Sequence, residues 1–159
     1  MPICWARVDD RLIHGQVVVA WRSYLRFDAI AVVDDAVAGD PYLRDVLRLA
    51  APADLDVGVH TTEEAVDVLA ASVSGQVLLL LKRPETALAL VEAGVALPHL
   101  NVGNLAAGPG SRRVLGSISL SSAHADALDA LAARGVRITF QATPDDPALD
   151  WQAVRRRRK

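Results

Sequence analysis

Short runs of apolar residues alternate along the chain with segments in which apolar residues recur every three to four positions. The runs predict buried strands, and the periodic segments predict helices that place one face on a core. Strands and helices that alternate in this way are typical of a largely parallel sheet. We therefore expect an α/β fold, an open and mostly parallel sheet with helices on both faces.

The expected strands are the most apolar runs. They cover residues 3–8, 29–34, 56–60, 76–81, 100–103, 117–120 and 136–142. The run at 76–81 is almost continuously apolar, which is typical of a central strand that helices cover on both faces. We expect this strand to lie in the middle of the sheet.

Capping residues mark where the helices begin. Asp40 and Pro41 suit the N-cap and the first helical position. Thr61, with Glu64 three positions later, predicts a capping box. The expected helices cover residues 15–25, 42–51, a segment opened by Thr61, 84–93 and 122–134.

The 159 residues suffice for one compact unit, which we expect over residues 1–150, followed by a basic tail at 151–159. Hydrophobic residues make up 52% of the chain but aromatic residues only 4%, so the core must be largely aliphatic. The one cysteine, Cys4, excludes an internal disulfide and a cysteine metal site, which fits a reducing cytoplasm.

The charge distribution argues against a nucleic-acid partner. The net charge is −2, and the basic residues 155–159 supply +5, so the remainder of the chain carries −7. We expect Arg155–Lys159 to be a solvated end without a catalytic role, although such a tail can contact anionic lipid. No apolar run approaches the length of about 20 residues that spans a bilayer, so we expect a soluble protein.

The candidate chemistry lies directly after the first strand. Asp9, Asp10 and Arg11 follow it, and His14 stands at the beginning of the next helix. This places charged groups at the carboxyl edge of a parallel sheet, where ligands bind in such folds. The first backbone N–H groups of the helix, at Gly15 and Gln16, lack helical partners and can donate to phosphate oxygens. The sequence therefore predicts an anion site.

His14 suits a phosphoryl carrier, because a neutral imidazole nitrogen is nucleophilic near neutral pH. Arg11 offers a planar fork for two phosphate oxygens. Asp9 or Asp10 can orient the imidazole or support Arg11, and the sequence leaves open which residue does which. A single histidine near a helix start is more often structural, and paired aspartates often only cap helices. The combination of these residues favours chemistry.

Residues 7–17, Arg-Val-Asp-Asp-Arg-Leu-Ile-His-Gly-Gln-Val, resemble the signature of the IIB components of the mannose/fructose/sorbose family of the bacterial sugar phosphotransferase system (PTS). The resemblance continues through residues 90–95, 100–105 and 135–136. It implies an open α/β sheet and a phosphohistidine at His14, hence a transferase of the protein-Nπ-phosphohistidine–sugar type. The sequence has no HExxH spacing, no cysteine pair, no GxxxxGK[ST] motif and no GxGxxG motif after the first strand, so we expect neither a metal nor a cofactor.

The resemblance also implies partners. The donor is the phosphohistidine of a IIA protein on a separate chain, and the acceptor is a sugar that enters through membrane IIC and IID components. The chain is then expected in the cytoplasm, held at the inner face of the membrane by the permease. The sugar and the oligomeric state stay open, a homo-oligomer included.

Two alternatives remain. A phosphorylation-state sensor would use the same chemistry at His14 without transport. A receiver-like phosphoaspartate domain has acidic residues after the first strand and Lys82 after a later one. Its phosphoacceptor should end the third strand, however, whereas Asp56 begins that strand and His60 ends it. The receiver interpretation is therefore the weaker one.

Overall fold

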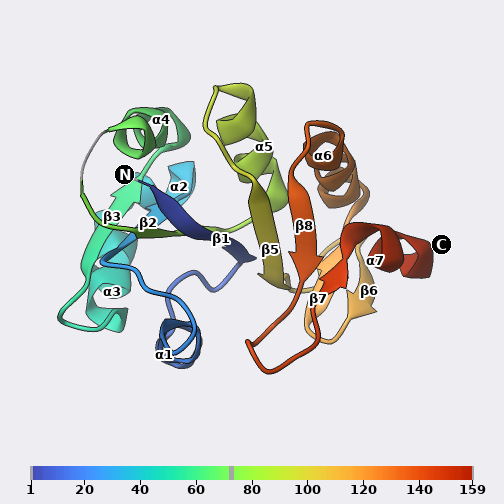
Figure 1. Cartoon of the computed structure of the whole chain (residues 1–159), viewed down its shortest axis with the longest axis horizontal. Coiled ribbons are helices and arrows are strands. Elements are labelled where there is room, and N and C mark those ends of the chain that lie inside the picture. Colours follow the sequence, from blue (N-terminus) through green and yellow to red (C-terminus); the bar gives the residue numbers. More distant parts are fainter. Residues whose placement is uncertain (1, 72–73, 159) are drawn as a thin grey trace.

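The structure, a computed structural model, describes residues 2–71 and 74–158, without the side chains of Gln16, Val17 and Arg158. Its main sheet has seven strands in the order β3-β2-β4-β1-β5-β8-β9 (Figure 1). Every neighbouring pair is parallel except β8 and β9 at one edge. The strands are β1 (Ile3–Asp9), β2 (Ala29–Val33), β3 (Asp56–His60), β4 (Val77–Leu81), β5 (His99–Asn104), β8 (Arg137–Phe140) and β9 (Leu149–Asp150).

Helices cover both faces of this sheet, as the sequence predicted. One face carries α1 (Gly15–Arg22), α2 (Asp35–Ala38) and α3 (Pro41–Ala50). The opposite face carries α4 (Thr62–Ala70), α5 (Pro84–Glu92), α6 (Ser122–Ala133) and α7 (Trp151–Arg158). A separate antiparallel hairpin consists of β6 (Arg112–Leu115) and β7 (Ile118–Leu120). The α/β fold class is confirmed.

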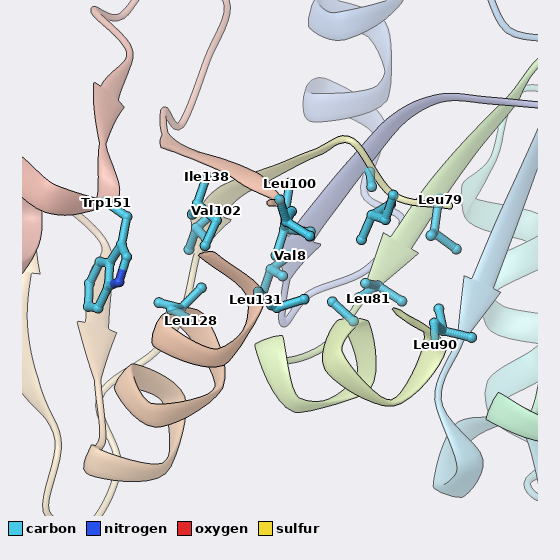
Figure 2. Packing of buried hydrophobic residues seen from close by; sticks show 14 of the residues in the cluster. Val8, Leu79, Leu81, Leu90, Leu100, Val102, Leu128, Leu131, Ile138 and Trp151 are labelled. Carbon is cyan, nitrogen blue, oxygen red and sulfur yellow. The ribbon is translucent and has the colours of Figure 1, made fainter. Parts of the chain in front are cut away.

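The larger core lies between the sheet and the helices α4 to α7. Figure 2 shows Leu128 and Leu131 of α6 packed toward strand residues that include Val8 and Val102. Every residue of β4 is buried, because the strand lies between β2 and β1 with helices on both faces. Each such aliphatic side chain contributes about 1.5–3 kcal/mol when it is removed from water. The prediction of a central strand at 76–81 is confirmed.

The predicted caps are present. The carboxylate of Asp40 accepts hydrogen bonds from the N–H groups of Tyr42 and Leu43 at 3.0 and 3.2 Å. Thr61 and Glu64 form the reciprocal capping box that opens α4. These helix starts were predictable because an N-cap depends on residues within one turn of each other.

Residues 151–158, expected as the beginning of a basic tail, are helical, while Arg155, Arg156 and Arg157 are exposed as predicted for the end of the chain. The helix is α7, in which Trp151 is 2% and Val154 0% exposed. Arg155 forms an ion pair with Asp129 of α6 at 2.9 Å. Trp151 and Val154 are three positions apart and therefore share one side of the helix, which gives α7 an apolar face among its many basic residues.

Strand β9 runs antiparallel to β8, with Leu149 opposite Phe140. This pairing places α7, which follows β9 directly, against the core. The short elements β9, β6 and the four-residue α2 were not predicted, because they are too short to carry a periodic signal. No helix in residues 2–71 or 74–158 is long and apolar enough to cross a membrane.

Candidate phosphoryl-transfer site

The site lies where β1 ends, at the carboxyl edge of the sheet between β4 and β5. The chain leaves β1 toward β2 and β3, returns to β4, and then crosses β1 to reach β5. The helix after β1 therefore lies on one face and the helix after β4 on the other. In open parallel sheets such a reversal leaves a crevice for ligands. The loop of residues 10–14, which we call the active-site loop, occupies this position.

A strained turn shapes the active-site loop. The N–H of Leu12 donates to the carbonyl of Asp9 at 2.9 Å, and Leu12 has a φ of +59°. A left-handed backbone costs a residue other than glycine on the order of 1–3 kcal/mol. The cost is offset because the side chains of Leu12 and Ile13 are both only 4% exposed and pack with the apolar residues beneath α2 and α3.

The carboxylate of Asp9 is the centre of the site. It is fully buried and accepts hydrogen bonds at Oδ1 from the backbone N–H and Nε of Arg11, at 3.1 and 3.0 Å. Its Oδ2 accepts from Nη2 of Arg11 at 3.1 Å and from Nη2 of Arg7 at 3.2 Å. Two guanidinium groups thus hold one carboxylate.

His14 is the N-cap residue of α1, with an extended backbone and no capping hydrogen bond from its side chain. The ring is 27% exposed, and its Nε2 lies 3.5 Å from Oδ2 of Asp9. This contact is longer than a hydrogen bond but within the range of an ion pair. The imidazole is therefore free of a capping role and lies with one nitrogen toward Asp9.

The surroundings keep the histidine neutral and the aspartate charged. Burial lowers the pKa of His14, and the charge of Arg11 lowers it further, against the opposing effect of Asp9. Burial alone would raise the pKa of Asp9, but the hydrogen bonds and charges of Arg11 and Arg7 outweigh it and hold the pKa below its usual value. A neutral ring beside a fixed carboxylate is a nucleophile with an orienting partner.

Asp10 points elsewhere. Its carboxylate accepts from the side-chain amide of Asn104, and it also accepts from the backbone N–H of Ala106 at 2.7 Å. Its own N–H donates to the carbonyl of Asn104 at 3.2 Å. The two aspartates thus have separate surroundings: Asp9 lies beneath His14, while Asp10 ties the active-site loop to the segment after β5.

A hollow of about 350 Å³ opens beside the ring. Arg11 and His14 line it together with Trp21 of α1, Ser117 before β7, and Thr143 after β8. Sequence analysis missed Ser117 and Thr143, because nothing local connects these distant turns to His14. The lining residues include two that carry hydroxyl groups, an arginine and a histidine, which are residue types suited to a small anionic or polyhydroxylated group.

Gly15 and Gln16 begin α1 directly after His14. Their N–H groups belong to the first helical turn, which has no intrahelical acceptors for them. Gly15 has a helical backbone, and a Cβ placed on it would meet nothing within 4 Å. The positive φ near the active-site loop lies at Leu12 and not at Gly15. The Gln16 side chain lies outside the described atoms.

Comparison with known proteins gives a consistent result. Residues 3–159 match the family model described as "PTS system sorbose subfamily IIB component". The crystal structure of the IIBSor domain of the sorbose permease from Klebsiella pneumoniae superposes with a TM-score of 0.93 and 32% identity, covering 98% of this chain and 97% of that one.

Two of the curated relatives from Escherichia coli K12 show how much of each chain is shared. The N-acetylgalactosamine-specific phosphotransferase enzyme IIB component 2 is 32% identical over 152 residues, which are 94% of this chain and 97% of the relative. The mannose-specific EIIAB component is 33% identical over 151 residues, which are 94% of this chain but 47% of the relative.

Proposed function

We propose that this chain, which belongs to the sorbose subfamily of PTS IIB components, carries a phosphoryl group on His14 from a IIA phosphohistidine to a sugar of the mannose, fructose or sorbose type. PTS IIB components are phosphotransferases, and the residue that carries the group is our inference. The contact between Nε2 of His14 and the buried Asp9 carboxylate supports it most directly.

This contact assigns the two ring nitrogens. A carboxylate attracts an N–H group and repels a lone pair, so we infer that Nε2, which lies 3.5 Å from Oδ2 of Asp9, carries the ring proton. Nδ1 of His14 then holds the free electron pair and attacks phosphorus. As the bond between phosphorus and Nδ1 forms, the bond to the donor nitrogen breaks, and the donor histidine keeps that electron pair. The positive charge that develops on the His14 ring is offset by Asp9.

Arg11 and the first amides of α1 bind the equatorial oxygens during this transfer. The transition state resembles metaphosphate and requires alignment and positive groups more than covalent help. Arg11 is 49% exposed at its side chain, so its guanidinium can turn to the phosphoryl group while its backbone N–H stays on Asp9. In the second step a sugar hydroxyl attacks phosphorus, the bond to Nδ1 breaks, and the hydroxyl proton passes to a base at the sugar site.

Exposed apolar side chains flank the site and suit a protein partner. We call Val19 on α1 and Tyr24 just after it, with Tyr42, Leu43, Val46 and Leu49 on α3, the apolar rim. A second hollow of about 230 Å³, lined by Arg11, Leu12, Leu43 and Val46 among others, joins the rim to the active-site loop. Exposed apolar clusters of this kind mark interaction sites.

We assign the apolar rim to the IIA donor, which must bring its own histidine to His14. The relative named EIIAB, of which this chain matches 47%, carries both parts in its name. A IIA protein on a separate chain would need a docking surface here. Membrane IIC and IID components supply the acceptor sugar and hold the chain at the inner face of the membrane. Whether the chain forms a homo-oligomer is independent of this mechanism.

The test is transfer of labelled phosphate from a phosphorylated IIA protein of this PTS family. We expect the wild type to be labelled, His14→Ala to be unlabelled, and His60→Gln, a control at the end of β3, to be labelled normally. The label should survive alkali and be lost in acid, as a phosphohistidine requires. Loss of the label in alkali would favour an aspartyl phosphate, and full labelling of His14→Ala would disprove the proposal.

A further inference from the structure

Arg7 of β1 is a charged side chain that is only 1% exposed. Its Nη1 donates to Oδ1 of Asn101 at 2.7 Å and to the carbonyl of Gln141 at 3.0 Å. Its Nη2 donates to the carbonyl of Ala142 at 2.8 Å and to Oδ2 of Asp9 at 3.2 Å. The guanidinium is thus fixed to β5 and to the segment after β8, as well as to Asp9.

The space around this guanidinium is shaped to it. Gly103 of β5 lies so close that a Cβ built on it would come within 2.0 Å of Cζ of Arg7. On another side the guanidinium carbon lies 5.4 Å from the ring centre of Trp21 on α1. Guanidinium groups are attracted to aromatic faces at this distance. A lysine ammonium cannot reproduce the planar fork that these partners surround.

The two arginines on Asp9 therefore differ. Arg11 is 49% exposed and has no rigid partner beyond Asp9 among the hydrogen bonds of the described residues. Arg7 is anchored at four points. Arg7 holds the carboxylate in one place, and together with Arg11 it keeps this fully buried carboxylate ionised.

We propose that Arg7 is a positioning residue for phosphoryl transfer: it fixes the Asp9 carboxylate so that Oδ2 faces Nε2 of His14. This goes beyond the proposed function and rests on it. Arg7 lies beneath Asp9 and acts through it. When Asp9 is held, the ring keeps one tautomer and Nδ1 stays the nucleophile. When Asp9 is loose, the ring samples both tautomers and its orientation toward the donor is lost.

The experiment is a double-mutant cycle on the rate of labelling by the phosphorylated donor. We expect Arg7→Met to lower the maximal rate on the order of 10- to 100-fold without changing the KM for the donor, as losses of orienting groups do. In an Asp9→Asn background the same substitution should change the rate less than about threefold, because the carboxylate that Arg7 positions is already absent. Equal effects in both backgrounds would overturn the proposal.

Two further measurements keep the proposal testable when Arg7→Met folds poorly. Arg7→Lys retains the charge and the stem but not the fork, and we expect it to lose rate as Arg7→Met does. Nitrogen NMR of the His14 ring at neutral pH should show hydrogen on Nε2 in the wild type and a mixture of tautomers in Arg7→Lys. An Arg7→Lys protein with wild-type rate and a single tautomer contradicts the proposal.

Arg134→Met is the matched control, since Arg134 is an exposed arginine at the end of α6 and 4.0 Å from its partner Glu92. It should leave the rate and the ring unchanged. The tautomer measurement needs no donor protein, so it separates this proposal from the carrier function. If wild type is never labelled, the proposed function fails; if wild type and Arg7→Met are labelled at the same rate, only the role of Arg7 fails.

Discussion

Oδ2 of Asp9 lies 3.5 Å from Nε2 of His14, while the neighbouring carboxylate, Asp10, accepts hydrogen bonds from Asn104 at the end of β5 and from Ala106 just after it. Two adjacent acids of the same type therefore have different tasks. One orients the ring, and the other holds the loop that carries it. This difference can be measured by removing one charge at a time.

We expect Asp9→Asn to lower the rate of His14 labelling on the order of 100-fold, since an amide cannot select the ring tautomer as a carboxylate does. Asp10→Asn should lower the rate less than about tenfold, because the amide oxygen can still accept one of the two hydrogen bonds. The measurement is the initial rate of His14 labelling in each of the two variants, compared with the wild type. Equal losses would show that the two acids share one task.

Arg11→Ala should slow transfer on the order of 100-fold, the cost of one preorganised donor to a developing charge. Its fold should be retained, because the side chain is 49% exposed and Asp9 keeps Arg7. Arg11→Lys should recover part of the rate, since it restores charge without the fork. Labelling rates and thermal melting test this together, and wild-type rates in Arg11→Ala would remove the residue from the site.

The apolar rim predicts a defect in donor binding. Tyr42 and Leu49 are 74% and 86% exposed, so replacing both with serine should change stability by no more than about 0.5 kcal/mol. The KM for the IIA donor should rise about tenfold, equivalent to the loss of about 1.4 kcal/mol of docking energy, with an unchanged maximal rate. Val68→Ser on α4, on the opposite face of the sheet, is the control. An unchanged KM would place the donor elsewhere.

His99 predicts a pH dependence of stability. Its ring packs on Trp5 with 4.4 Å between centroids, and Nε2 lies 2.8 Å from Oγ1 of Thr139. Burial, helped by the charge of Arg137, lowers the pKa of His99 from 6.5 to about 4. Between these values the unfolded chain binds a proton that the folded chain does not bind, so stability falls as the pH falls from 6.5 to 4 and levels off below 4.

His99→Phe keeps an aromatic ring against Trp5 and removes the proton. The difference in melting temperature between wild type and His99→Phe should therefore be constant above pH 7 and move in favour of the variant toward pH 4. Only the change with pH counts, because the lost bond to Thr139 shifts the variant by the same amount at every pH. A difference that stays constant down to pH 4 would contradict a lowered pKa.

The sequence alone determined the order of the longer strands and helices up to residue 140, the caps at Asp40 and Thr61, and the placement of His14 and Arg11 at the carboxyl edge of the sheet. These features depend on residues close together in the chain, and local patterns report them. The sequence also contains a signal for the environment of Arg7, which is a charged residue inside an apolar strand, because burial of such a residue requires partners.

Only the tertiary structure decided what those partners are. The bonds of Arg7 reach Asn101, Gln141 and Ala142, which are more than 90 residues away in the chain. It also separated Asp9 from Asp10, because successive side chains at the end of a strand point to opposite faces. Likewise, Trp151 is buried only because β9 returns the chain along β8. The local sequence pattern determines where strands and helices form. The surroundings of a buried charge depend on which of these strands and helices pack together in the fold.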